Sequence, residues 1–413
     1  MKLLLSSRSI CSLYTVLILT ANTVAERPQY ETGEIKIAAA TAEEPIRKTL
    51  SISAARDYLA KGSQAWTEER KCVSCHTNGT FMQLAPSFGT LFSNQIESHR
   101  EFFLSESAYL KKTATPQSLK EGLQPTQLAY IANGLATYDA AKNKLTVETK
   151  ETLDLMLTAQ SEDGSYNNLK CWPPFESSSY HGANIAAMAL AIAPNYLEQA
   201  TKEQQKQIDA LKRYLQTTKA PHDYARMLLL WTATKWKGLI NEQIQQDTIK
   251  MIIAHQQDDG GWSMRTFAAP EKWGNGVRKE LISSEVQQEG TPSDGHQTGL
   301  AIMLLRESGI PTDHPAVQRG IKWIKTNQRE SGRWWTRSLN GDGQQYITYS
   351  GTFYPLRALQ LCGELDSNSK IRGWETPFFT VPQLHCLNLL GGLEIGRAAN
   401  LRVIVVPIAK PGS

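Results

Sequence analysis

Apolar residues recur at helical spacing through most of the chain, and Gly-rich turns separate the segments. Three segments share one pattern, in which an amphipathic stretch is followed by Gln, then Gly, then an aromatic ring. They occupy residues 153–166, 249–262 and 321–334. Alternating strand-like patterns are scarce before residue 380. The pattern predicts an all-α protein built from helices joined by tight turns.

The turns repeat with fixed spacing. The glutamines are Gln160, Gln256 and Gln328, the glycines are Gly164, Gly260 and Gly332, and the aromatic residues are Tyr166, Trp262 and Trp334. The Gly can end each helix in a left-handed conformation, and the Gln can hydrogen-bond into the turn. A weaker copy covers residues 54–66, and further helices are predicted within 120–138, 207–215 and 224–231. Because one helix pair cannot bury its apolar face alone, neighbouring pairs must stack.

Residues 319–328, followed by Gly332 and Trp334, resemble the QW motif of triterpene cyclases. The resemblance covers most of residues 50–380 and implies an α/α toroid, a single barrel of inner and outer helices, over residues 46–380. A short irregular tail is expected at 381–413. Squalene cyclases, protein prenyltransferases and some binding proteins share such a toroid, so the fold names no reaction. The alternative to a closed toroid is an open helical solenoid. Complete triterpene cyclases carry a second helical domain, whereas the length of this sequence predicts a single barrel.

The N-terminus has the pattern of a secretory signal. Lys2 and Arg8 flank an apolar core at residues 10–20, and the small residues Thr23 and Ala25 follow. We expect residues 1–25 to be a cleaved signal peptide, because the apolar run is short for a membrane anchor. Residues 26–45 are then a flexible leader. A bacterial protein that is secreted or periplasmic is predicted, with no membrane span in the mature chain.

The net charge and the cysteine content limit which classes of partner and cofactor the sequence supports. The net charge of +4 falls by two units without Lys2 and Arg8, and so small a balance gives no argument for nucleic acid. No nucleotide cofactor is expected. Once Cys11 leaves with the signal, five scattered cysteines remain, which is not a disulfide framework. One CxxC pair stands out among them.

Cys72, Cys75 and His76 form a CxxCH segment, the covalent attachment signature of haem c. Two thiols at this spacing can add to the two vinyl groups of one haem, and the adjacent His can bind the iron. Exported bacterial chains are where this attachment is made. Three alternatives stay open at this point: a disulfide or redox pair, half of a zinc site, and a chance match.

The histidines recur with the repeat. His76, His181 and His296 fall at about the same repeat position, and Gly79 and Gly299 follow two of them at the same distance. In toroids of the resembled family this position begins an inner helix and faces the central cavity. We hypothesise that His181 or His296 approaches the haem iron or a metal, with Met82 as another candidate iron ligand. The alternative is that each His caps its own helix.

The acid motif of triterpene cyclases is degraded. Its D-x-D-D-T-A counterpart is Asp294-Gly295-His296-Gln297-Thr298-Gly299. Asp294 and His296 are the candidate catalytic residues. However, a histidine is far too weak an acid to protonate an alkene, which makes classical cyclisation doubtful. A zinc site of the prenyltransferase type is also disfavoured, because the Asp-x-Cys spacing that it needs does not occur in the sequence.

Three functions from different classes follow from these observations. The first is a periplasmic haem c toroid that acts in electron transfer or in redox chemistry on a bound apolar molecule. The second is a non-haem isoprenoid or lipid enzyme on the cyclase scaffold. The third is a lipid-binding or protein-binding toroid without catalysis. The partners expected are an isoprenoid or other apolar ligand and a periplasmic redox protein.

Overall fold

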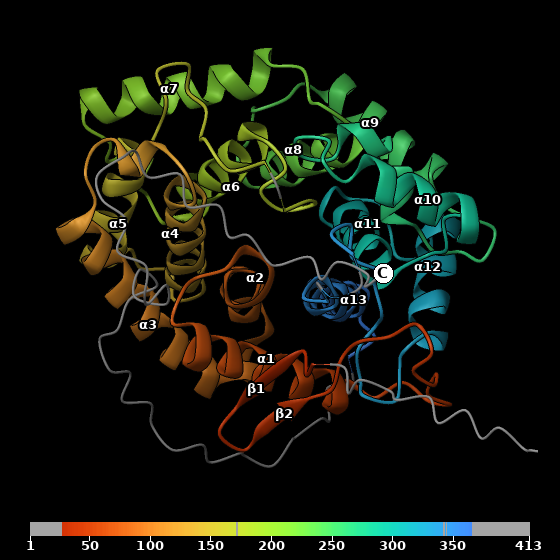
Figure 1. Cartoon of the computed structure of the whole chain (residues 1–413). Coiled ribbons are helices and arrows are strands. Elements are labelled where there is room, and N and C mark those ends of the chain that lie inside the picture. The colour runs from red at the N-terminus through yellow and green to blue at the C-terminus, as the bar shows by residue number, and fades with distance from the viewer. Residues whose placement is uncertain (1–26, 171, 342, 344, 366–413) are drawn as a thin grey trace, which may run out of the picture.

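The computed structural model describes residues 27–365 apart from 171, 342 and 344. Over these residues the protein is a double ring of helices (Figure 1). The predicted signal peptide at 1–25, the tail at 381–413 and the end of the predicted toroid beyond residue 365 lie outside the described residues. The all-α toroid expected from the sequence is confirmed.

Six short helices form the inner ring. They are α2 (Thr80–Leu84), α4 (Gln124–Ala141), α6 (Ser179–Ile192), α8 (Asp223–Lys235), α11 (Gly295–Glu307) and α13 (Ile347–Leu361). Each packs against the next in this order, and α13 packs back against α2 (Figure 1). The ring is therefore closed, and the alternative of an open solenoid is excluded.

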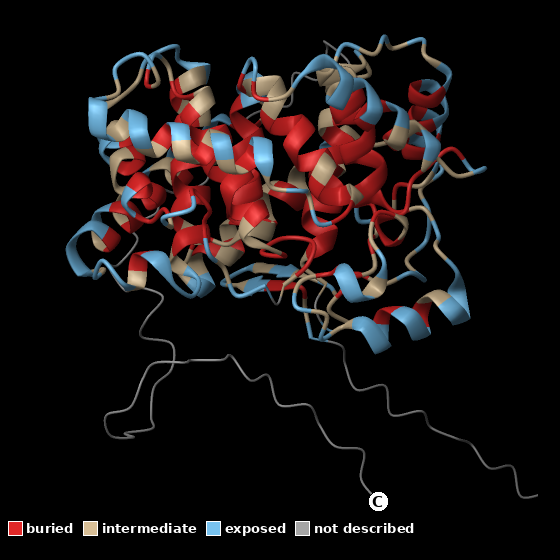
Figure 2. Cartoon of the chain, turned by 90° about the horizontal axis from the view of Figure 1, so that it is seen from above, coloured by how far each residue is buried: buried red, intermediate tan, exposed pale blue. Residues whose placement is uncertain are grey.

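The outer helices cover the inner ring. They are α1 (Ile52–Arg70), α3 (Ser93–Thr113), α5 (Val147–Thr158), α7 (Lys202–Thr217), α9 (Glu242–Ala254) and α12 (Pro315–Thr326), with an additional helix α10 (Lys279–Glu289) between α9 and α11. Buried residues lie where the two rings meet and along the inner helices, whereas the outward faces are exposed (Figure 2). No described helix has the length and apolarity that a membrane crossing requires.

The predicted Gln turns link successive outer helices. In each turn the Gln Nε2 donates to the carbonyl of its own turn Gly and to a carbonyl of the next outer helix or its cap. Gln160 reaches Gln207 in α7, and Gln256 reaches Ala316 in α12. Trp262 and Trp334 donate their indole N–H groups to carbonyls of the preceding helix at 2.7 and 2.8 Å. The predicted hydrogen bonding of the glutamines into the turns is confirmed. The glycines do not end the helices, because α5, α9 and α12 already end at Thr158, Ala254 and Thr326. Each Gly instead takes a positive φ within the turn that follows.

The last Gln closes the ring. Gln328 Nε2 donates to the carbonyls of Gly332 and Ser51 at 2.8 and 2.9 Å, and its Oε1 accepts from Ser51 N–H at 2.7 Å. Ser51 is the N-cap of α1. Gly332 has φ 93°, and a Cβ there would lie 2.3 Å from the Ala54 carbonyl carbon. The first and last hairpins therefore meet at a joint that accepts only glycine.

The segment before α1 differs from the flexible leader that the sequence predicts. Strands β1 (Tyr30–Thr32) and β2 (Ile35–Ile37) pair antiparallel, and both contact α1. Arg333 holds this segment through its ion pair with Glu44 at 2.8 Å and through the carbonyls of Ala38 and Ala39. The hairpin is too short to give a clear alternating pattern, and its partners are distant in sequence.

Candidate functional site

The CxxCH segment links the outer helix α1 to the inner helix α2. Cys75–Gly79 forms a single π-helical turn that leads directly into α2. Asn78 stabilises this turn, because its Oδ1 accepts from Ser74 N–H at 2.8 Å and its Nδ2 donates to the Cys72 carbonyl at 3.0 Å. A Cβ at residue 79 would lie 2.4 Å from the Ser74 carbonyl oxygen, so the turn requires Gly79. The Thr-Asn-Gly sequence after the motif is thus explained by backbone packing.

His76 is half-buried in an aromatic corner. Its ring stacks on Tyr346 with centroids 5.0 Å apart and meets Trp66 edge-on at 4.6 Å. His76 Nδ1 shares a hydrogen bond of 2.8 Å with Thr77 Oγ1, which also bonds the Tyr30 hydroxyl at 2.9 Å. Burial, with Arg70 nearby, lowers the pKa of His76 to about 3. The imidazole is therefore neutral at pH 7, and its orientation is set through Nδ1.

The two thiols of the motif are half-buried and are not joined in a disulfide. Cys75 is partly buried and packs against the hydrophobic core. Burial raises the pKa of the phenols of Tyr130, Tyr224 and Tyr354, and electrostatic interaction with Cys75 raises the pKa of each further. These tyrosines belong to the inner helices α4, α8 and α13.

His181 and His296 occupy the position predicted for them, at the first turns of α6 and α11. Each presents Nε2 to a tyrosine hydroxyl at 3.0 Å, His181 to Tyr130 and His296 to Tyr224. His296 Nδ1 also bonds Ser350 Oγ at 2.8 Å. Neither is the cap of its helix, because Ser178 and Asp294 take that role. The alternative that these histidines cap their own helices is wrong, whereas iron binding would require each to leave its tyrosine.

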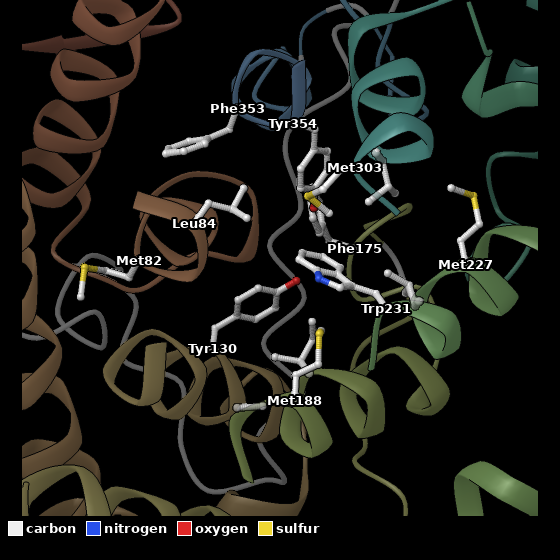
Figure 3. Packing of buried hydrophobic residues seen from close by; sticks show 14 of the residues in the cluster. Met82, Leu84, Tyr130, Phe175, Met188, Met227, Trp231, Met303, Phe353 and Tyr354 are labelled. Carbon is white, nitrogen blue, oxygen red and sulfur yellow. The ribbon is translucent and has the colours of Figure 1, made fainter. Parts of the chain in front are cut away.

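A loop from the rim fills the space between these histidines. The ring of Phe175 meets those of His181 and His296 edge-on, at centroid distances of 6.1 and 5.7 Å. Figure 3 shows Phe175 beside Tyr354, in the middle of the ring. Next to it, Glu176 is buried at φ 42°, and burial raises the pKa of its carboxyl to about 7. The buried centre of the ring thus contains an ionisable acid that sequence reasoning missed.

The side chain of Met82 does not point to the buried centre of the ring. Its side chain is fully buried and points away from the other labelled residues of the ring centre (Figure 3). A Cβ at Gly134 on α4 would lie 2.7 Å from Met82 Cβ and 2.8 Å from the Phe103 ring. Met82 therefore packs between α2, α3 and α4, which contradicts its candidacy as an iron ligand. It follows the π-turn within α2, and helical geometry directs it to the outer helices.

Asp294 acts as a helix cap. Its two carboxylate oxygens accept from the backbone N–H groups of Met264 at 2.7 Å and Gln297 at 2.9 Å. Burial raises the pKa of Asp294 to about 6 despite these bonds. Because both oxygens are engaged with backbone, the carboxyl orients α11 and its His296. The catalytic role expected of Asp294 and His296 stays a prediction.

Among the described residues, no group of three or more His, Cys, Asp or Glu side chains is arranged around a common metal site. The structure brings the two Tyr–His pairs to the buried centre of the ring, on either side of Phe175, and it separates Met82 from them. Sequence reasoning missed Tyr130, Tyr224 and Glu176. The tyrosines could have been found from their positions on predicted helices, whereas Glu176 depends on how its loop inserts.

Comparison with known families agrees with this architecture. Residues 224–363 match the family model described as Squalene-hopene cyclase C-terminal domain. A squalene–hopene cyclase of Bradyrhizobium diazoefficiens is 24% identical over 273 residues, which are 58% of this chain and 38% of that protein. A probable squalene–hopene cyclase of Sinorhizobium fredii is 33% identical over 115 residues, 26% of this chain and 18% of that protein.

Sporulenol synthase of Bacillus subtilis is 30% identical over 118 residues, 28% of this chain and 17% of that protein. The chain thus spans 38% or less of the length of these curated relatives. Among solved structures, one titled "Glycosidase Wild Type" aligns with a TM-score of 0.47 at 10% identity, over 76% of this chain and 99% of that chain. So weak a likeness carries no argument about activity. The described residues thus form a closed double ring of helices, and residues 224–363 of this ring are similar to the C-terminal domain of squalene–hopene cyclases.

Proposed function

We propose that the chain is an exported, squalene cyclase-like toroid that carries covalent haem c on Cys72, Cys75 and His76. Its proposed role is electron transfer or redox chemistry on an apolar molecule. The observation that carries the proposal is the placement of the CxxCH segment in the turn that starts an inner helix, with Cys75 packed against the hydrophobic core.

The residues present fit the attachment of haem. The two thiols are half-buried and are not joined to each other, and their CxxC spacing is the one that thioether bonds to the two vinyl groups of a haem require. The backbone around them is fixed, because Trp66 Nε1 and Asn78 Nδ2 both donate to the Cys72 carbonyl. A fixed loop keeps the spacing of the thiols constant, which a macrocycle with two attachment points requires.

His76 fits the role of the protein ligand to iron. Ligating histidines usually hold their other ring nitrogen in a hydrogen bond that fixes the tautomer. His76 does this through Nδ1, which bonds Thr77 Oγ1, and Tyr30 supports the threonine in turn. Burial also keeps the imidazole in its neutral, metal-binding form. When bound, haem c supplies one-electron chemistry.

The buried Tyr–His pairs at the centre of the ring define what the chain contributes besides the attachment of haem. The Tyr130–His181 and Tyr224–His296 pairs can hold or move a proton between a phenol and an imidazole. The Phe175 loop covers them and excludes water. Protons and electrons can then be handled in one enclosed space, which suits redox chemistry on an apolar molecule.

Alkene protonation of the classical cyclase type is not part of the proposal. Asp294 is engaged by backbone, and the position of the acid is taken by His296, whose pKa burial lowers to about 3. Burial stabilises its neutral form, so at pH 7 the imidazole does not carry the additional proton that it would have to donate to an alkene.

To test the proposal, the full chain, including the predicted signal peptide at residues 1–25, is expressed in a host that performs cytochrome c maturation. We expect periplasmic protein whose Soret band stays with the polypeptide after denaturation. The Cys72→Ser/Cys75→Ser double variant should lose the covalent band, and His76→Met should keep it while its wavelength shifts. Cys362→Ser is the matched control, because this thiol lies outside the motif. Colourless wild-type protein would overturn the proposal.

A further inference from the structure

The hairpin before α1 reaches the CxxCH segment through one buried side chain. The ring of Tyr30 in β1 contacts those of Tyr346 and Tyr349, at centroid distances of 5.7 and 6.1 Å. Tyr346 in turn stacks on the ring of His76. The Tyr30 hydroxyl bonds Thr77 Oγ1 at 2.9 Å, across 47 positions of the chain. A residue of the hairpin therefore belongs to the surroundings of His76.

Gln29 fixes the position of Tyr30. The side-chain oxygen of Gln29 accepts from the Tyr58 hydroxyl in α1 and from Arg333 Nη1, each at 3.0 Å. Its Nε2 donates to the Gln345 carbonyl, just before α13, at 2.9 Å. Three distant segments of the ring thus hold the residue next to Tyr30. The phenol cannot move away without breaking this set of buried hydrogen bonds.

The direction of the hydrogen bonds at His76 follows from the position of its proton. In the described part of the chain, the ring nitrogen that forms a hydrogen bond is Nδ1, which lies 2.8 Å from Thr77 Oγ1. If Nε2 binds iron, the proton of the neutral imidazole must be on Nδ1. Nδ1 then donates to Thr77 Oγ1, and the Thr77 hydroxyl can donate its own hydrogen to the oxygen of Tyr30. The two hydroxyls thus extend the hydrogen bond of the iron ligand into the hairpin.

A hydrogen bond that Nδ1 donates changes the ligand strength of the same ring at Nε2. It raises the basicity of the imidazole as a metal ligand. A more basic ligand favours the oxidised iron, which carries the higher charge, and this lowers the reduction potential. Thr77 is fully buried and Tyr30 is 2% exposed. The low dielectric constant of such surroundings strengthens a chain of hydrogen bonds.

We propose that Thr77 and Tyr30 are positioning residues that lower the reduction potential of a haem bound to His76, by holding Nδ1 as a hydrogen-bond donor. The inference rests on the proposed attachment of haem. It adds the hairpin before α1 to that site and assigns it the control of the potential.

The experiment measures the midpoint potential of the full chain after cytochrome c maturation, by redox titration followed in the absorption spectrum. Thr77→Val removes the hydroxyl and nearly keeps the shape of the side chain. It should change the ratio of oxidised to reduced haem at a given potential about tenfold, which is a rise of about 59 mV for one electron. Thr77→Ser keeps a hydroxyl and should retain the potential of wild type. Tyr30→Phe leaves the bond of Nδ1 in place and should give a smaller rise.

Tyr58→Phe is the matched control. Tyr58 is also a buried tyrosine beside Tyr349, and its hydroxyl bonds Gln29 instead of Thr77. The control should cost about as much stability as Tyr30→Phe, because each removes one buried hydroxyl, and it should leave the potential unchanged.

The outcomes separate this inference from the proposed function. A wild-type chain without covalent haem would overturn both. In a chain that carries haem, equal potentials for wild type and Thr77→Val would overturn the inference alone, as would an equal rise in Thr77→Ser or Tyr58→Phe. If Thr77→Val does not fold, the comparison of Tyr30→Phe with Tyr58→Phe decides, and equal potentials for these two variants would count against the inference.

Discussion

Gln328 and Ser51 are joined by a pair of hydrogen bonds although 277 residues separate them. Ser51 N–H donates to the Gln328 side-chain oxygen at 2.7 Å, and the Gln328 side-chain nitrogen donates to the Ser51 carbonyl at 2.9 Å. Ser51 also caps α1 through its own hydroxyl. The contact between the first and the last hairpin is thus as specific as the contacts between successive repeats.

Gln328→Ala should destabilise the whole domain. It removes both bonds to Ser51 and the bond to the Gly332 carbonyl, and it leaves buried backbone groups without partners. We expect a loss of about 1–3 kcal/mol in the free energy of unfolding, measured by urea denaturation. Gln243→Ala changes an exposed glutamine on α9 and should cost less than about 0.5 kcal/mol. Equal effects of the two changes would contradict the role assigned to ring closure.

Gly332→Ala and Gly309→Ala separate backbone strain from steric clash. Both glycines have nearly the same positive φ, 93° and 91°, so both alanines carry a strain of about 1–2 kcal/mol. A Cβ at residue 309 meets nothing within 4 Å, whereas one at residue 332 lies 2.3 Å from backbone of Ala54. We therefore expect Gly332→Ala to lower the melting temperature clearly more than Gly309→Ala. Similar melting temperatures for the two variants would mean that the joint can relax.

Glu176→Gln should stabilise the protein at high pH. Burial raises the pKa of Glu176 in the folded state to about 7, above its ordinary value of 4.5. The folded state therefore binds this proton more tightly than the unfolded state, and stability falls as the pH rises from about 4.5 to about 7. The glutamine has no proton to lose. At pH 8 the variant should gain up to about 3 kcal/mol relative to wild type, and at pH 4 little.

The measurement for Glu176 is the difference in unfolding free energy between variant and wild type at the two pH values. Glu34→Gln, at an exposed position in the turn between β1 and β2, is the control and should change the free energy of unfolding by less than about 0.5 kcal/mol. A constant difference for Glu176→Gln from pH 4 to pH 8 would show that its carboxyl titrates normally.

If His181 or His296 binds the haem iron through Nε2, that atom must first leave the tyrosine hydroxyl to which it is hydrogen-bonded. Tyr130 and Tyr224 hold the two Nε2 atoms at 3.0 Å, so each competes with a metal. If one histidine is a ligand, the matching Tyr→Phe variant should increase the low-spin haem signal in the absorption spectrum. The other Tyr→Phe variant is then the control. Spectra that neither variant changes would discard both histidines as ligands.

The sequence predicts the parts of the fold that depend on local pattern. The turns at Gln160, Gln256 and Gln328 are correct because glycine, glutamine and an aromatic ring at fixed spacing have one low-energy arrangement after a helix. Placing His181 and His296 at the starts of inner helices is also correct, but that prediction came from the family resemblance. Closure of the ring came from the resemblance as well, because stacking of neighbouring helices alone would also allow an open solenoid.

The parts that the sequence does not predict depend on distant contacts. The β1–β2 hairpin is held by Arg333, which lies about 300 residues away along the chain. The direction of Met82 depends on a single π-turn, which rotates the helix that follows. The position of Glu176 depends on a loop that inserts between two helices, and no local pattern reports such an insertion.

Folding of this chain must wait for its far end. A partly synthesised ring exposes the uncovered flanks of α1 and α2 on one side and of the latest hairpin on the other. Those flanks are covered only when α12 and α13 arrive and Gln328 finds Ser51. A chain that ends before this point leaves two apolar helix faces exposed, one at each end of the open ring. We therefore expect shortened forms to associate with one another instead of remaining monomeric.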